Sequence, residues 1–315
     1  MTMPTRNIGS LEVSVVGLGC NNFGGRIDEA RSREVVAAAL DSGITFFDTA
    51  DIYGGTRSEE ILGRALGRRR REVVVATKFG MKLDEQHNGA KPDYVRRALE
   101  DSLGRLGTDH VDLYQLHAPD PETPIGDTLA ALDAQVHAGK VRQIGCSNFS
   151  AAQLRQALEA APDGAARFVS VQNEYSILHR RPEVDVLDEC RESATIFIPY
   201  YPLARGLLTG KYHQGQPAPA GSRLASAGVE QYEHLASDEN LAVVERLAEV
   251  AGHQGHDLVE LAIAWLLTRP AVASVIAGAT TPDQVRANVR AADWVPGSEV
   301  LAEVDDIVPP AAVRV

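Results

Sequence analysis

The chain has few cysteines, few aromatic residues and no long apolar run. Its three cysteines, Cys20, Cys146 and Cys190, are too few for a disulfide framework in 315 residues, and no pair has the spacing of a metal site. Such sparse cysteine favours a reducing compartment. No apolar run approaches the roughly 18 residues of a membrane span. The first residues, MTMPTRNIGS, lack the apolar segment of a signal peptide. We therefore expect a cytoplasmic protein without a membrane partner.

The chain also lacks an excess of positive charge. Its formal net charge is -12, which argues against a nucleic-acid partner or an anionic membrane surface. The one basic run, Arg68–Arg71, could bind an anion. It follows a helix predicted to end at Gly67, however, and cations are favourable at a helix C-terminus, so we interpret the run as structural. With 44% hydrophobic residues, the chain can bury a substantial core.

Short apolar segments alternate with stretches of helical periodicity. Val95, Leu99, Leu103 and Leu106 form one apolar helical stripe, and a similar stripe covers residues 125–136. A last helix is predicted to begin at Thr281-Pro282-Asp283. The eight predicted strands are 15–19, 44–48, 73–78, 111–117, 141–148, 168–173, 195–200 and 272–278.

Eight apolar strands separated by helices predict an α/β protein with a parallel sheet, specifically a (β/α)8 TIM barrel formed by residues 1–315 as a single domain. A doubly wound open sheet is the alternative. Its dinucleotide fingerprint is incomplete, because GLGCNN has Asn22 at the position of the third glycine. Residues 201–236, rich in Gly and Pro, predict a long functional loop after strand 7.

Polar residues stand where successive predicted strands end. Asp48, Lys78 and His117 end the second, third and fourth strands, and Tyr53 follows the second. Each alone has a structural explanation, as a turn residue, a packed aromatic, a surface charge or a strand cap. In a barrel these strand ends form the active-site face, so the four are expected to converge. Asp48 would hold Lys78, Lys78 would lower the pKa of Tyr53, and His117 would donate to a substrate oxygen.

This set is suited to polarising and protonating a carbonyl, which is reduced if a cofactor supplies a hydride. A metal-dependent barrel hydrolase or lyase is the alternative. The sequence contains neither the nucleophile motif G-x-S-x-G nor the metal motifs His-x-His and H-E-x-x-H, so no metal is expected.

At these residues the sequence resembles the aldo-keto reductase superfamily, and specifically its bacterial and potassium-channel β-subunit branches. The resemblance covers roughly residues 10–300. Its motifs are GLG (17–19), FFDTADIYG (46–54), SEEILGRAL (58–66), ATKFG (76–80), DLYQLH (112–117), GKVRQIGCSNFS (139–150), VQNEYS (171–176), PLARGLLTGKY (202–212) and AGATTPDQVRANV (277–289). The resemblance implies the catalytic tetrad Asp48, Tyr53, Lys78 and His117, with Tyr53 as general acid.

The resemblance also implies a nicotinamide cofactor, NADPH in preference to NADH. Ser147, Asn148 and Gln172 would bind the carboxamide, and the ring of Tyr200 would stack on the nicotinamide. The remaining implied cofactor residues are Tyr201, Leu203, Gly206, Lys211, Arg223, Gly278, Thr280, Gln284 and Asn288.

Three positions depart from the family pattern. Tyr201 stands where a serine is common, and Ala287 where an acid often contacts the adenine. The turn GATTPDQ lacks the Lys and Arg with which many relatives hold the 2′-phosphate, and Lys211 and Arg223 are expected to compensate.

From strand-end placement we expect Phe23, Phe79 and Phe149 to wall the entrance for a small carbonyl substrate, which the sequence does not identify further. A nucleotide-sensing regulatory subunit with little turnover is the alternative function. Cys20 and Cys146 could meet as an oxidation-sensitive pair, although small buried side chains are the favoured interpretation. The oligomeric state is left open.

Overall fold

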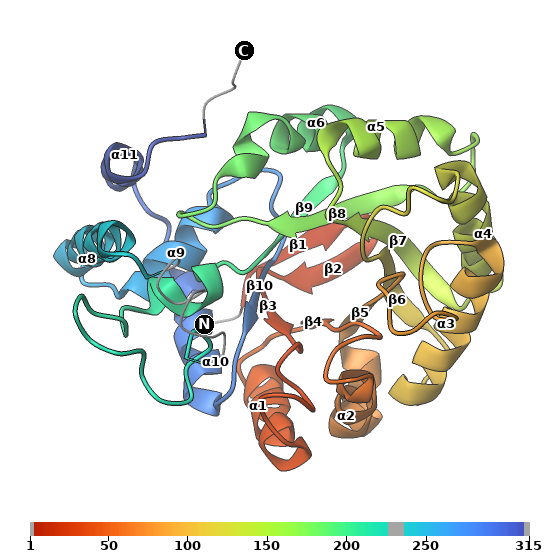
Figure 1. Cartoon of the computed structure of the whole chain (residues 1–315), viewed down its shortest axis with the longest axis horizontal. Helices are drawn as coiled ribbons and strands as arrows, with labels where there is room; N and C mark the ends of the chain where they lie inside the picture. Colours follow the sequence, from red (N-terminus) through yellow and green to blue (C-terminus); the bar gives the residue numbers. More distant parts are fainter. Residues whose placement is uncertain (1–2, 226–235, 312–315) are drawn as a thin grey trace.

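Eight parallel strands form a barrel surrounded by helices in the computed structural model, which describes residues 3–225 and 236–311 (Figure 1). The strands are β3 (Val16–Gly19), β4 (Phe46–Asp48), β5 (Val74–Phe79), β6 (Val111–Leu116), β7 (Val141–Ser147), β8 (Phe168–Glu174), β9 (Ile196–Tyr200) and β10 (Val275–Gly278). They follow one another in chain order, and β10 pairs with β3. A parallel bridge between Phe197 and Val272 joins β9 to the segment before β10. The predicted (β/α)8 barrel is therefore confirmed.

The helices follow the predicted alternation. They are α1 (Glu29–Asp41), α2 (Arg57–Leu66), α3 (Pro92–Leu106), α4 (Ile125–His137), α5 (Ala151–Ala160), α6 (Val186–Ser193), α8 (Asp238–His253), α9 (Leu258–Leu267), α10 (Pro282–Arg290) and α11 (Ser298–Ile307). The whole predicted stripe of α3 is buried. Thr281 caps α10 by accepting from the Gln284 amide, with Pro282 at the first turn, as predicted. No helix among residues 3–225 and 236–311 is long and apolar enough to cross a membrane.

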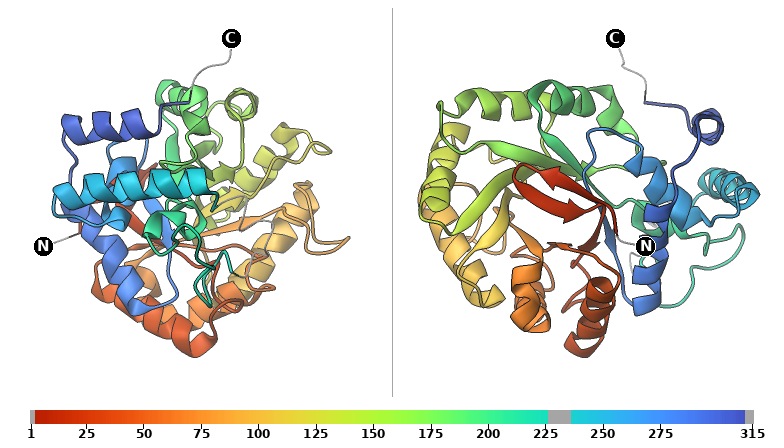
Figure 2. Two further views of the ribbon diagram at one scale, coloured as in Figure 1. Left: turned by 60° about the vertical axis from the view of Figure 1, so that its left-hand side comes forward. Right: turned by 180° about the vertical axis from the view of Figure 1, so that it is seen from behind.

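A hairpin that the sequence analysis did not predict closes one end of the barrel. Its strands, β1 (Thr5–Ile8) and β2 (Leu11–Ser14), pair antiparallel. Ile8, Leu11 and Val13 are buried in a separate apolar cluster with barrel residues such as Phe46 and Leu113. The view from behind shows the hairpin across the middle of the barrel (Figure 2). It therefore plugs the end at which the strands begin.

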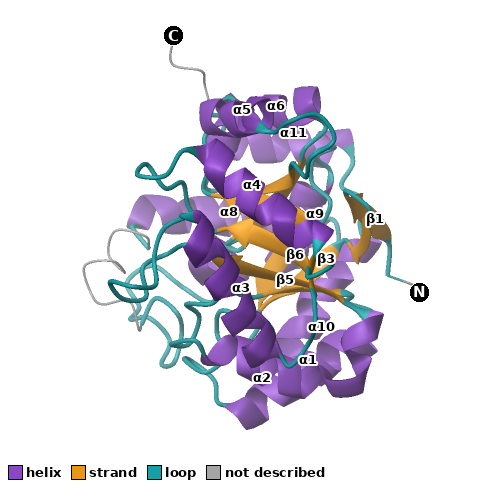
Figure 3. Cartoon of the chain, turned by 90° about the vertical axis from the view of Figure 1, so that its right-hand side faces the viewer, coloured by secondary structure: helices purple, strands orange, loops and turns teal. Residues whose placement is uncertain are grey.

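The opposite end carries the long loops, which reach out beyond the strands on the side away from the hairpin (Figure 3). The parallel register pairs Gly19 with Asp48, Lys78 with Gln115 and Ser147 with Gln172. The polar residues that end these strands thus meet on one face, as expected for such barrels.

The long loop predicted at 201–236 is only partly irregular. It begins with the short helix η3 (Ala204–Thr209), which packs on α9 and contains left-handed backbone at Arg205 and Gly206. Residues 226–235 lie outside the described part.

Another short helix, η1 (Gly67–Glu72), contains the basic run, where Arg70 pairs with buried Asp112 at 2.8 Å and Arg69 with Glu72 at 2.9 Å. These contacts support the structural interpretation of the basic run at Arg69 and Arg70.

One hydrophobic cluster extends from Val15 to Val304 and joins the barrel strands to the surrounding helices. This continuity supports our proposal that the chain forms a single domain. Two further short helices in the described part are η2 (Arg181–Val184), in the connection between β8 and α6, and η4 (Ala291–Asp293), in the connection between α10 and α11.

Candidate active site

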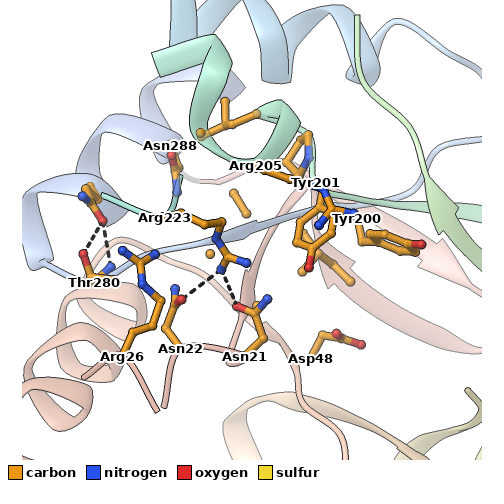
Figure 4. Close-up of a pocket in the computed structure, with 18 of the residues that line it drawn as sticks. Asn21, Asn22, Arg26, Asp48, Tyr200, Tyr201, Arg205, Arg223, Thr280 and Asn288 are labelled. Atoms are coloured by element: carbon orange, nitrogen blue, oxygen red, sulfur yellow. Dashed lines mark hydrogen bonds between the residues drawn. The ribbon is translucent and has the colours of Figure 1, made fainter. Parts of the chain in front are cut away.

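A cavity of about 570 Å³ opens at the loop-bearing end of the barrel (Figure 4). Its lining includes three of the four predicted catalytic residues, with Lys78 directly beneath. It also includes all of the predicted cofactor residues. The predicted residues in the lining are Asp48, Tyr53, His117, Ser147, Asn148, Gln172, Tyr200, Tyr201, Leu203, Gly206, Lys211, Arg223, Gly278, Thr280, Gln284 and Asn288. Residues from seven strand ends and η3 thus meet in one place.

An ion pair between Asp48 and Lys78 forms the floor. Lys78 Nζ lies 2.5 Å from Asp48 Oδ2 and donates to the Thr49 carbonyl at 2.9 Å. Both side chains are almost fully buried. Gln172 Nε2 donates to the other carboxylate oxygen at 2.9 Å. Burial lowers the pKa of Lys78, but Asp48 and Tyr53 raise it by more, so the ammonium stays charged.

The turn after β4 carries Tyr53 back over this pair. The Tyr53 amide donates to the Ala50 carbonyl, and Lys78 Nζ lies 5.2 Å from the centre of the Tyr53 ring. Burial raises the pKa of the phenol, and Asp48 raises it too, while Lys78 opposes both. The net direction is upward. This differs from the expected lowering because the Asp48 carboxylate compensates the ammonium charge and burial then dominates.

His117 stands beside Tyr53, with ring centres 5.8 Å apart and an interplanar angle of 80°. Burial and the Lys78 charge lower the pKa of His117 to about 3, so the imidazole is neutral at neutral pH. Its Nδ1 is buried without a hydrogen-bond partner among the described residues. A neutral imidazole has one N–H to donate, as a bound carbonyl oxygen requires.

Next to this group, the ends of β7, β8 and β9 form a hydrogen-bonded set of amides and hydroxyls. Ser147 Oγ donates to the Gln172 carbonyl at 2.7 Å, and Asn148 Nδ2 donates to the His117 carbonyl at 2.9 Å. The Tyr200 hydroxyl donates to Asn148 Oδ1 at 2.8 Å. Asn148 is held at φ 62°, a left-handed backbone that is unusual outside glycine and is common at functional sites.

Further along the cavity the lining becomes cationic. Arg26, Arg205, Lys211 and Arg223 all line it, whereas Asp48, the one carboxylate among the described lining residues, is already paired with Lys78. The ring of Tyr201 lies against two of these cations, 4.6 Å from Arg205 and 5.4 Å from Arg223. Such a surface suits an elongated anion.

At the far end lies the turn between β10 and α10. The Thr280 amide and hydroxyl both donate to Gln284 Oε1, at 2.7 and 3.0 Å. Gly278 leaves room for Asn22, since a Cβ at Gly278 would lie 3.2 Å from Asn22 Nδ2. Asn288 is buried behind the turn.

The comparison with known families agrees with this geometry. A model of the aldo/keto reductase family matches residues 15–309, nearly the whole chain. The chain belongs to the aldo/keto reductase family.

Among its relatives, this aldo/keto reductase is 37% identical over 281 residues to "Aldo-keto reductase yakc [NADP(+)]" of Schizosaccharomyces pombe, covering 85% of this chain and 81% of the relative. It is 35% identical to a "Probable voltage-gated potassium channel subunit beta" of Oryza sativa subsp. japonica, with 97% of both chains covered. It is 34% identical to "Aldo-keto reductase YhdN" of Bacillus subtilis, covering 95% and 91%.

The three phenylalanines expected at the substrate entrance lie elsewhere in this aldo/keto reductase. Phe23, Phe79 and Phe149 are at most 3% exposed and belong to the main hydrophobic core. Phe79 stacks on the ring of Tyr114 at 4.6 Å. None of the three is in the cavity lining. Large apolar side chains at strand ends gain more by packing under the helices than by facing a wet cavity.

The sequence analysis missed several lining residues. They include Asn21, Asn22, Arg26, Met81 and Arg205. Asp48 was predicted because it is a polar residue at the end of a strand. The same criterion applies to the loop after β3, where the segment GCNNFGGR carries Asn21, Asn22 and Arg26. Arg205 lies inside a motif already assigned to the cofactor. Met81 is 40% exposed, follows β5 and offers an apolar contact at the cavity mouth.

The cysteines of the aldo/keto reductase are all free and buried. Burial raises the pKa of the Cys20 thiol, and the pKa of the Cys146 thiol is raised by burial and by Cys190 rather than by Cys20. These thiols are poorly ionised, so the interpretation as small buried side chains holds.

Proposed function

We propose that this aldo/keto reductase is an oxidoreductase that uses NADPH to reduce an aldehyde or ketone to an alcohol. The observation that supports this most is the convergence of Tyr53, His117 and the Asp48–Lys78 pair beneath one end of a cavity that continues as a cationic channel. The amide and hydroxyl groups of Ser147, Asn148 and Gln172 suit a carboxamide, and the Tyr200 ring suits a stacked nicotinamide.

When bound, NADPH supplies the hydride that adds to the carbonyl carbon. Tyr53 donates its phenolic proton to the carbonyl oxygen as negative charge develops there, which completes the alcohol. The N–H of neutral His117 orients that oxygen. Lys78 stabilises the phenolate left on Tyr53, and Asp48 keeps Lys78 charged and in place. The raised pKa of Tyr53 keeps the acid protonated at neutral pH.

Support for NADPH over NADH comes from two sources. One relative carries NADP(+) in its name. The cavity also holds four cations, more than a single pyrophosphate needs.

A nucleotide-sensing regulatory subunit is the second candidate, favoured by the potassium-channel β subunits among the relatives. The two candidates differ in turnover. The test is a titration of purified protein with NADPH, followed by fluorescence quenching, and then NADPH oxidation with a panel of aldehydes and ketones. Saturable binding with turnover on some carbonyls supports the reductase. Tight binding without turnover on the panel favours the sensor, and no binding contradicts both.

A further inference from the structure

Arg26 lies in the segment between β3 and α1 and lines the cavity from the side opposite η3. Its Nη2 donates to the Gly221 carbonyl at 2.8 Å, while the side chain remains exposed at the cavity rim. No step of the proposed reaction uses it.

One buried residue, Asn22, fixes the surroundings of Arg26. The Asn22 carbonyl accepts from the Arg26 amide at 3.0 Å. The Asn22 side chain accepts from Arg223 Nη2 at 3.0 Å and donates to the Ala279 carbonyl at 3.2 Å. Asn22 is 3% exposed, so this arrangement is well packed. Arg26, Arg223 and the turn after β10 are therefore held together at one place.

In the part of the chain that the structure describes, no carboxylate neutralises the cations at this place. Burial and the charge of the neighbouring Arg223 lower the pKa of the Arg26 guanidinium, against a smaller opposing effect of Tyr212. Within the described residues, no carboxylate forms an ion pair with Arg26, Lys211 or Arg223. Like charges held around a cavity favour an anion between them.

Three of the four cations follow one another along the cavity. In Figure 4, Arg26 lies beside Thr280, and Arg223 lies between Arg26 and the pair Tyr200–Tyr201. Arg205 contacts the Tyr201 ring, at the other end. Of the three labelled arginines, Arg26 thus lies farthest from the ring of Tyr200, where we expect the nicotinamide.

We propose that Arg26 binds the 2′-phosphate of NADPH and so selects NADPH over NADH. This inference rests on the proposed function. The turn after β10 contributes Thr280 and Gln284 to the lining at this end but no cation, and Arg26 supplies one from the facing loop. A planar guanidinium can hold a phosphate through two parallel hydrogen bonds, and the exposed rim leaves room for it.

The test compares Arg26→Gln with Arg31→Gln, a matched control on α1 whose partner is the exposed Glu34. Fluorescence quenching gives the affinities for NADPH and NADH, and competition gives those for adenosine 2′,5′-bisphosphate and AMP. Loss of one charge-assisted contact predicts that Arg26→Gln weakens NADPH and the bisphosphate about 10- to 100-fold. NADH and AMP should be unaffected, Arg26→Lys should retain part of the affinity, and the control should match wild type.

Equal weakening of NADPH and NADH would overturn the inference, because Arg26 would then serve a part that both cofactors share. Unchanged NADPH affinity in Arg26→Gln would overturn it too, while leaving the proposed function intact. If wild type binds neither nucleotide, the proposed function itself fails and the inference falls with it.

Discussion

The buried pair of Asp48 and Lys78 links the stability of the barrel to its chemistry. Taking two charges out of water is costly, and their mutual attraction offsets this only with good geometry. Here the Lys78 ammonium has two acceptors, and Asp48 receives the amide of Gln172 as well. An apolar pair would stabilise the floor of the barrel equally well, so we attribute the buried ion pair to the proposed catalysis rather than to stability.

Removing only the Lys78 ammonium should therefore destabilise the folded protein. We expect Lys78→Met to lower the free energy of unfolding by about 3–5 kcal/mol, because Asp48 is left as a buried unpaired charge. The double variant Lys78→Met/Asp48→Asn should recover much of that loss without recovering activity. Chemical denaturation of wild type and the three variants, Asp48→Asn included, measures this. A double variant no more stable than Lys78→Met would show that the charge pair is not the cause.

The turn between β4 and α2 is the element that brings Tyr53 over the ion pair. Gly54 has φ 59°, and a Cβ there would lie 2.2 Å from the Phe23 carbonyl oxygen, far inside any allowed contact. Gly55 has a similar φ of 63°, but nothing lies within 4 Å of a Cβ. Substitution of each of the two adjacent glycines therefore distinguishes the effect of a steric contact from the effect of backbone strain.

Gly54→Ala should therefore displace the turn and lower kcat/KM together with the melting temperature. Gly55→Ala is the matched control. It should lower the free energy of unfolding only by the strain of a left-handed residue, about 1 kcal/mol. Thermal unfolding and steady-state kinetics of both variants provide the measurement. Equal effects of the two substitutions would mean that the contact with Phe23 does not position Tyr53.

At the level of elements, the sequence predicted all eight barrel strands, because each is a short apolar run that ends in a polar residue, a tyrosine or a glycine. It did not predict β1 and β2. These four-residue strands contain Arg6, Asn7 and Glu12 and have only one face in the core, so their apolar pattern is short and weak.

The residues of the site could be predicted wherever they stand at strand ends. Arg26 and Asn22 were missed because their role depends on contacts with Gly221, Arg223 and Ala279, far away in sequence.

At the scale of the whole molecule, one buried carboxyl group, that of Asp51, lies outside the cavity lining. Asp51 is 1% exposed, and neither carboxylate oxygen has a hydrogen-bond partner among the described residues. Burial and Glu59 raise its pKa to about 7, against the opposing effects of Arg105 and Lys78. The nearby phenols of Tyr94 and Tyr114 are also affected by its charge. Above neutral pH the fold must therefore hold an unpaired buried carboxylate.

This predicts a pH-dependent stability. Since the pKa of Asp51 is higher in the folded than in the unfolded state, the folded protein binds the proton more tightly. Stability should fall as pH rises from about 4 to 7, by at most about 4 kcal/mol for this group. Asp51→Asn should be more stable than wild type at pH 8 and similar near pH 4, as measured by denaturation at both values. A constant difference between the two proteins would exclude Asp51 as the titrating group.

The central claim is that Tyr53 protonates the carbonyl, and the most direct measurement is NADPH oxidation by wild type and Tyr53→Phe with the best carbonyl of the panel. Cofactor affinity of both proteins is measured by fluorescence quenching. The account predicts that kcat falls about 10²–10⁴-fold in Tyr53→Phe while NADPH binding is retained. Retained turnover in Tyr53→Phe, with binding unchanged, would contradict the assignment of the acid.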